Sequence, residues 1–155
     1  MEAHFTWKAK LFRNKYDIFR NDTLAGEMKD KNWSRTSLGE LNTRKITFET
    51  RGIFRTETKI LDTVSETELG IISYNIWKTK ATITFNNKEY TFQYDNLFHT
   101  KWSISNENGP LVKYQSTISN GIIDSYTDDE VLILAGFYIR HFFQQNAASS
   151  AAAAT

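Results

Sequence analysis

Val131-Leu132-Ile133-Leu134-Ala135-Gly136-Phe137-Tyr138-Ile139, followed by Phe142 and Phe143, is the stretch that decides how this chain folds. A helix formed by this run is apolar on every face, and such a helix must be enclosed by protein or by lipid. Arg140 and His141 interrupt the run, whereas a membrane span needs about 20 predominantly apolar residues. The run therefore favours a core helix and no transmembrane span, with a weak or interfacial membrane anchor as the alternative. Gly136, a small residue in mid-helix, suggests that a strand passes close to it.

Thr127-Asp128-Asp129-Glu130 comes just before this run and has the form of a capping box. In such a box the Thr hydroxyl accepts from the amide three residues on, and the Glu carboxylate reaches back to the Thr amide. The acids also lie at the positive end of the helix dipole, so we interpret them as a cap instead of a metal or catalytic cluster. We expect a hydrophobic helix over residues 128–145 and a disordered Ala/Ser-rich tail over 146–155.

The length of 155 residues predicts one domain, residues 1–145, that is large enough for a real core. Aromatic residues make up 14 %, which favours strands, and the net charge of +1 does not suggest a nucleic-acid partner. Without cysteine, the chain has no disulfide, no thiolate metal site and no Cys nucleophile. Met1-Glu2-Ala3-His4 does not open an apolar signal segment, so we expect a cytoplasmic protein.

Short stretches that alternate apolar and polar residues recur along the first 126 residues. In the first of them Phe5, Trp7, Ala9 and Leu11 alternate with polar residues, and Asn86-Asn87 joins the clearest hairpin. These stretches are 5–11, 16–20, 24–28, a short strand plus loop within 29–40, 45–48, 53–61, a mostly buried 69–77, 81–85, 90–94, 102–104, 111–114 and 122–126. About a dozen strands at hairpin spacing predict an antiparallel sandwich or barrel.

The number of strands and the apolar helix fit together. An eight-stranded barrel holds only side chains or one small ligand, whereas about twelve strands leave a lumen wide enough for a helix. Closure also removes the unpaired edges of the sheet. We therefore predict a mainly β fold, a closed antiparallel barrel of about twelve strands wrapped around a buried C-terminal hydrophobic α-helix.

Three segments repeat the order strand, polar turn, glycine. They are Tyr16-Asp17-Ile18-Phe19-Arg20-Asn21-Asp22-Thr23-Leu24-Ala25-Gly26, Ile60-Leu61-Asp62 through Leu69-Gly70-Ile71-Ile72, and Trp102-Ser103-Ile104-Ser105-Asn106-Glu107-Asn108-Gly109. With the capped terminal helix, residues 1 to about 145 resemble the tubby C-terminal-like superfamily, which includes tubby domains, LURP-one-related proteins and phospholipid scramblases. The resemblance implies a twelve-stranded barrel around its C-terminal helix. Tubby domains bind phosphoinositide headgroups through basic side chains on the barrel wall, and scramblases act at membranes with calcium. The tubby C-terminal signature, a cysteine for palmitoylation and a calcium-binding acidic loop have no counterpart here.

Few residues offer chemistry. His4, His99 and His141 have no His partner at metal-ligand spacing, and the glycines stand singly at turns instead of forming a phosphate loop. His99, near Asp95, could serve as a base in a small hydrolase, but no nucleophile signature accompanies it. Arg140 and His141 are placed to interact with the last carbonyls of the helix. We expect no enzyme activity, no catalytic residue, no metal and no cofactor.

Basic side chains are the remaining candidates for a site. If Trp7 and Ala9 point inward, Lys8 and Lys10 point outward, with Arg13 and Lys15 near the following turn, and by the same alternation Lys78 and Lys80 share an outer face. Such pairs could hold an anionic headgroup, or could simply be part of a solvated wall.

The leading hypothesis is a non-enzymatic binding module that associates through its barrel exterior with an anionic membrane surface, a phosphoinositide-like lipid or a protein partner. It would be cytoplasmic or peripheral at the membrane. The alternative is a carrier of a small apolar ligand, similar to lipocalins and fatty-acid-binding proteins, which would need an empty lumen.

Overall fold

The computed structural model describes residues 2–10, 15–31, 36–51 and 57–154. Twelve strands are followed by one helix, α1 (Glu130–Ala154). The strands are β1 (Ala3–Lys10), β2 (Lys15–Arg20), β3 (Thr23–Asp30), β4 (Thr36–Leu41), β5 (Arg44–Arg51), β6 (Glu57–Asp62), β7 (Glu68–Tyr74), β8 (Lys80–Phe85), β9 (Lys88–Tyr94), β10 (Lys101–Asn106), β11 (Gly109–Ser116) and β12 (Asn120–Ser125).

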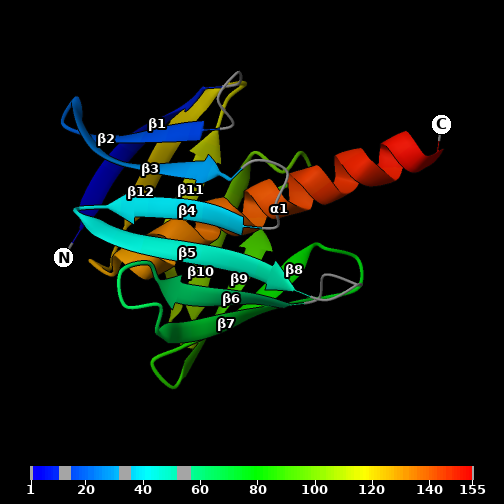
Figure 1. The fold of residues 1–155 in the computed structure, drawn as a ribbon. Coiled ribbons are helices and arrows are strands. Elements are labelled where there is room, and N and C mark those ends of the chain that lie inside the picture. Colours follow the sequence, from blue (N-terminus) through cyan, green and yellow to red (C-terminus); the bar gives the residue numbers. More distant parts are fainter. Residues whose placement is uncertain (1, 11–14, 32–35, 52–56, 155) are drawn as a thin grey trace.

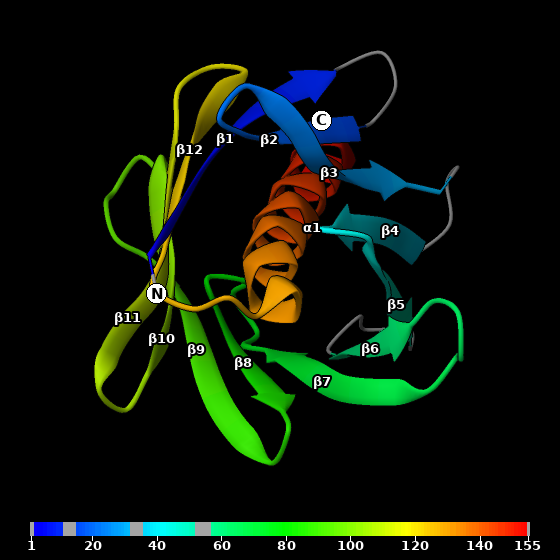
Figure 2. The same ribbon diagram turned by 90° about the vertical axis from the view of Figure 1, so that its left-hand side faces the viewer.

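Every strand pairs with its neighbours in the chain, and the first strand pairs with the last, so the sheet closes into an antiparallel barrel (Figure 1). Closure joins β1 to β12, with Phe5 opposite Ile123 and Trp7 opposite Gly121. Viewed from one end, the strands surround α1 (Figure 2). The predicted fold class is confirmed: a closed twelve-stranded antiparallel barrel with one C-terminal helix.

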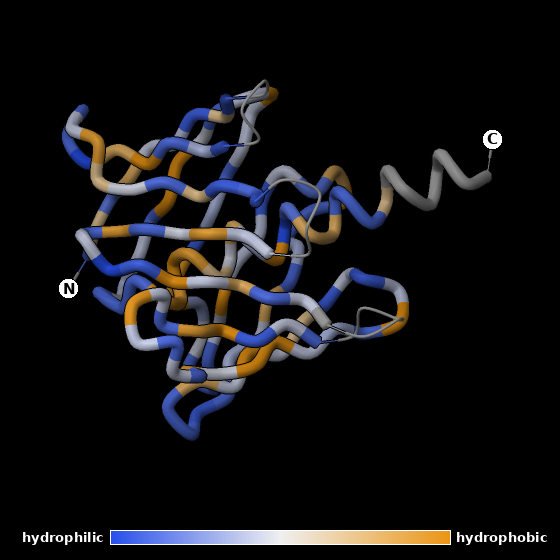
Figure 3. The backbone as a smooth tube through the Cα atoms, viewed as in Figure 1, coloured by the Kyte–Doolittle hydropathy of each residue, from blue (hydrophilic) through white to orange (hydrophobic). Residues whose placement is uncertain are grey.

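The side chains alternate between water and the barrel interior along the strands, as β8 illustrates with Ala81, Ile83 and Phe85 buried. Figure 3 shows the same alternation of apolar and polar residues around the wall. Inside, α1 contributes the centre of the core with Val131, Leu132, Ile133, Leu134, Ala135, Phe137, Tyr138, Ile139, Phe142 and Phe143, all at most 6 % exposed. The apolar segment of the helix, residues 131–143, is therefore enclosed by protein, as its all-round apolar sequence requires.

The two ends of the barrel differ because the helix starts at one and leaves at the other (Figure 1). We call them the helix-start end and the helix-exit end. Odd-numbered strands finish at the helix-exit end, where Asp30 at the end of β3 accepts a hydrogen bond from Gln145 at 2.7 Å. Ser116 at the end of β11 likewise accepts from Arg140 at 3.1 Å. The loops β7–β8, β9–β10 and β11–β12 therefore all lie at the helix-exit end.

Both ends of the helix differ from the prediction. The helix begins at Glu130, and its cap is Asp129, whose carboxylate accepts from the Val131 amide at 3.0 Å. Thr127 instead accepts from the Asp129 amide at 3.2 Å, so the cap lies two residues beyond the predicted position. At its C-terminus the helix runs to Ala154, through most of the tail expected to be disordered. Alanine has the highest helix propensity of all residues, and this continues a helix that the barrel has already nucleated.

One predicted strand was too long. Residues 69–77 were expected to form a mostly buried strand, but β7 ends at Tyr74, and Ile76 and Trp77 are exposed in the following loop. Because the loop residues after Tyr74 are apolar like those of the strand, the hydrophobic pattern did not show where β7 ends. The predictions for Leu11, Arg13, residues 32–35 of the expected strand and loop within 29–40, and residues 53–56 lie outside the described residues.

Candidate functional site

The structure places the predicted basic residues near the helix-exit end but in two groups. Lys8 and Lys10 are exposed near the end of β1, and Lys80 is exposed at the start of β8. Since β1 and β8 are not adjacent in the ring of strands, the two pairs do not form one site. Lys15 belongs to β2, where its ammonium pairs with Asp17 at 3.2 Å and Glu27 at 2.9 Å.

Lys78 differs from the prediction that it shares an outer face with Lys80. It lies in the β7–β8 loop with a left-handed backbone, φ 54°, so strand alternation does not apply to it. Its half-buried side chain enters a pocket of about 270 Å³ between the β7–β8 loop, the end of β9 and α1. We call this the rim pocket; its lining is Trp77, Lys78, Thr79, Tyr94, His99, Phe143, Gln144, Asn146 and Ala147.

The rim pocket combines a cation with aromatic faces. The Lys78 ammonium lies 5.8 Å from the centre of the Tyr74 ring and 3.5 Å from the Asn75 carbonyl oxygen, and burial lowers the pKa of Lys78. His99 stacks on Tyr94 with ring centres 3.8 Å apart. Burial raises the pKa of Tyr94 to about 12, so its phenol stays neutral at physiological pH. No carboxylate is part of the lining, which leaves the Lys78 charge available to an anion.

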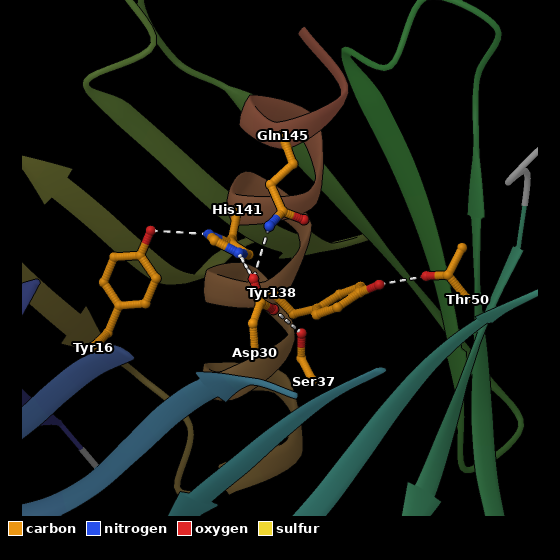
Figure 4. Close-up of polar contacts among 7 residues, drawn as sticks. All are labelled: Tyr16, Asp30, Ser37, Thr50, Tyr138, His141 and Gln145. Carbon is orange, nitrogen blue, oxygen red and sulfur yellow. Dashed lines mark hydrogen bonds and ion pairs between the residues drawn. The ribbon is translucent and has the colours of Figure 1, made fainter. Parts of the chain in front are cut away.

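A polar network fixes the helix to β2 and β3, on the side of the barrel opposite the rim pocket (Figure 4). His141 connects two strands: Nε2 contacts the Asp30 carboxylate on β3, and Nδ1 lies 3.0 Å from the Tyr16 hydroxyl on β2. Ser37 and Gln145 also donate to Asp30. Burial acts to raise the pKa of Asp30, but the hydrogen bonds from His141, Ser37 and Gln145 outweigh it and hold that pKa below its ordinary value. Because the carboxylate is already saturated with donors, we assign this network a structural role.

A second polar group is buried deeper, where Tyr138 of α1 meets β5 (Figure 4). The Tyr138 hydroxyl contacts Thr50, whose hydroxyl lies 2.7 Å from that of Thr58. The Thr58 hydroxyl in turn lies 2.6 Å from that of Tyr74. These hydroxyls satisfy one another in the core, and burial raises the pKa of Tyr74 far above its ordinary value. Neutral hydroxyls that satisfy one another in this way fix the rotation of the helix and supply neither nucleophile nor base.

Arg140 does not interact with the end of the helix, contrary to the expectation, because α1 continues beyond it. Its guanidinium lies 4.3 Å from the Trp102 ring centre and 5.9 Å from that of Trp7, and it donates to Ser116. Burial lowers the pKa of Arg140. The cation is held by aromatic faces, a favourable arrangement for a partly desolvated guanidinium.

Two further pockets lie elsewhere on the molecule. One of about 720 Å³ at the helix-start end has Glu89, Glu107 and Asp129 in its lining, which opposes an anion. The other, of about 330 Å³, lies between β1, β11 and β12 and includes Lys8, whose side chain is exposed and not half-buried as that of Lys78 is. Within the described ranges, no cluster of three or more His, Asp or Glu side chains could hold a metal ion. The rim pocket is thus the described pocket that best suits an anionic group.

Sequence reasoning identified Lys78 but not its surroundings. Tyr94 and His99 line the same pocket as Lys78 because the segments that carry them meet beside α1 in the folded barrel. No spacing in the sequence indicates that arrangement. Asp30 and His141 are separated by 111 residues, so their contact had no local signal either.

Comparison with models of known protein families, with curated proteins and with solved structures finds no match to this chain. No helix in the described part of the chain has the length and apolar character needed to cross a membrane.

Proposed function

We propose that this protein is a non-enzymatic module that binds the headgroup of an anionic phospholipid in the rim pocket. The observation that carries the proposal is Lys78, a half-buried lysine in an aromatic-lined pocket without a carboxylate. Lys78 would contact the headgroup phosphate, while Lys8, Lys10 and Lys80 near the same end would attract the membrane surface. Basic residues near an anionic surface each contribute about 1 kcal/mol.

Membership of the tubby C-terminal-like superfamily is part of this proposal. The closed twelve-stranded barrel around a C-terminal helix is the feature that supports it. The phosphoinositide binding of tubby domains gives a precedent for a headgroup ligand. A ligand carrier is disfavoured because the side chains of α1, Phe137 and Ile139 among them, occupy the space that its ligand would need.

The test is co-sedimentation with phosphatidylcholine vesicles, with and without phosphatidylserine or a phosphoinositide. We expect binding to the anionic vesicles that weakens as salt is added, because the attraction is screened. Lys78→Gln should weaken that binding about fivefold, the equivalent of about 1 kcal/mol per lysine. Lys88→Gln, at the exposed start of β9 on the helix-start end, is the matched control and should bind as the parent does. Absence of salt-sensitive binding, or equal effects of the two substitutions, would contradict the proposal.

A further inference from the structure

Three successive loops at the helix-exit end present large apolar side chains to water. Ile76 and Trp77 lie in the β7–β8 loop, Leu97 and Phe98 in the β9–β10 loop, and Ile118 in the β11–β12 loop. Their exposed fractions range from 81 % for Trp77 to 104 % for Ile118, so these side chains project almost completely from the protein. Single exposed apolar residues are ordinary, but their concentration on adjacent loops at one end marks an interaction surface.

The opposite end is built differently. Its turns are short and polar, with the left-handed pairs Asn21-Asp22, Asn42-Thr43 and Asn86-Asn87 joining successive strands. Asparagine and aspartate tolerate that conformation, which tight hairpin turns require. Val64 is the large apolar side chain exposed to a similar degree among the described turns there. The contrast between the ends shows that the apolar loop tips are not a general property of the hairpins.

The shape of the apolar surface decides which partner fits. The five side chains belong to three separate loops and are each almost fully exposed, so they project singly and do not pack together into one flat patch. A bilayer is fluid and can accommodate apolar side chains that project from separate loops, whereas a protein partner would need a pocket for each loop tip. Tryptophan and phenylalanine are also suited to the boundary between headgroups and acyl chains.

Lysines outnumber acids beside the three described tips. Lys78 and Lys80 follow directly after the β7–β8 tip, and Lys101 follows the β9–β10 tip. Asp95 is the acid beside these tips, and Glu57 is exposed at the start of β6 on the same end. The excess of lysine at the tips is complementary to an anionic bilayer. With the tips below the headgroups, these lysines would lie at the level of the phosphates.

We infer that the tips of the β7–β8, β9–β10 and β11–β12 loops insert into the interfacial layer of a lipid bilayer, so that the barrel docks with its helix-exit end toward the membrane. The inference rests on the proposed function for the lipid class, and adds the inserted surface and the orientation. Insertion places the opening of the rim pocket among the headgroups, where Lys78 can reach them.

The absence of cysteine from the sequence allows a direct test. Phe98→Cys and Asn87→Cys place one spin label at the helix-exit end and one at the helix-start end of the full chain. With vesicles containing phosphatidylserine, the label at position 98 should become accessible to oxygen and protected from a water-soluble nickel reagent. The label at position 87 should stay in water. Labels in water at both positions on vesicle-bound protein would overturn the inference.

A second measurement uses no label at the loop tip. Leu97→Ser with Phe98→Ser removes two apolar tips from an exposed loop, where surface substitutions are well tolerated by the fold. Vesicle binding should weaken about tenfold or more, given the apolar area lost from insertion. Val64→Ser, at the helix-start end, is the control and should bind as the parent does. Unchanged binding by the double variant would overturn the inference.

The outcomes separate this inference from the proposed function. Salt-sensitive binding with position 98 in water would keep the headgroup proposal and reject insertion. Insertion that is equal on neutral vesicles and unaffected by Lys78→Gln would keep the inserted surface and reject the headgroup site. If the protein self-associates and the label at position 98 is protected without vesicles, the tips form a contact between two copies and insertion is rejected. Absence of binding to every vesicle would also reject insertion.

Discussion

Gly136 shows how closely the helix and the wall approach each other. A Cβ atom at this position would lie 2.2 Å from the Tyr114 hydroxyl oxygen and 2.3 Å from the ring carbon that bears it. Tyr114 itself is anchored there, because its hydroxyl donates to the Ile133 carbonyl at 2.8 Å. The sequence predicted a strand close to Gly136, and the structure identifies it as β11.

Gly136→Ala should therefore destabilise the protein, although the same change in an exposed helix stabilises it by about 1 kcal/mol. We expect a loss of about 1–3 kcal/mol in the free energy of unfolding, because the Tyr114 ring must move out of a close-packed core. Chemical denaturation checks the value. Gln144→Ala, at an exposed position on the same helix, should have little effect, and a stabilising Gly136→Ala would show that Tyr114 has room to yield.

At the scale of the elements, β3 and α1 are joined by the Asp30–His141 contact. The folded-state pKa of Asp30 is lower than its ordinary value, since donors from His141, Ser37 and Gln145 outweigh the effect of burial. The unfolded chain therefore binds this proton more readily than the folded protein does. The stabilisation is complete above the ordinary Asp pKa of about 3.9 and is lost as the pH falls through the lower, folded-state value.

We predict that Asp30→Asn costs about 1–3 kcal/mol of unfolding free energy at neutral pH, where a buried and hydrogen-bonded charge is lost. The difference from the parent should shrink below about pH 4, because Asp30 of the parent is then being protonated. Urea unfolding at a series of pH values measures it. Asp128→Asn, at an exposed carboxylate, is the control, and a difference that is constant with pH would refute the linkage.

Prediction from the sequence worked where the signal was local. Alternation in 81–85 and 90–94 with Asn86-Asn87 between them gave the β8–β9 hairpin, because side-chain period and turn residues both act over a few positions. It did not work where tertiary contacts decide: Ile76 and Trp77 read as strand although they lie on a loop, and the rim pocket depends on loops that meet only in the folded barrel. Lys78 was selected by a strand pattern that does not extend to it.

Across the whole molecule, the wall and the helix are one cooperative unit. Trp7, Phe48, Phe92 and their neighbours on the strands form one buried cluster with the side chains of α1. The C-terminal part of the helix projects away from the barrel (Figure 1). Residues up to Gln145, which donates to Asp30, should thus determine stability, and the projecting part should not.

A chain that ends at Ala147 should keep its free energy of unfolding to within about 0.5 kcal/mol of the parent. A chain that ends at Ala135 loses Phe137, Tyr138, Ile139, Phe142 and Phe143 from the core and should not fold, since the loss of even one such side chain costs about 2–5 kcal/mol. Circular dichroism and thermal melting distinguish the two. A cooperative transition in the shorter chain would show that the wall is stable without its centre.

The position of the core helix after all twelve strands has a consequence for synthesis. All twelve strands leave the ribosome before residues 131–143, so the nascent polypeptide exposes its lumen-facing side chains until that segment has emerged. Domains that form a local core can fold while they emerge. This barrel must wait for its helix, and its unfinished sheet is the state that chaperones would need to protect.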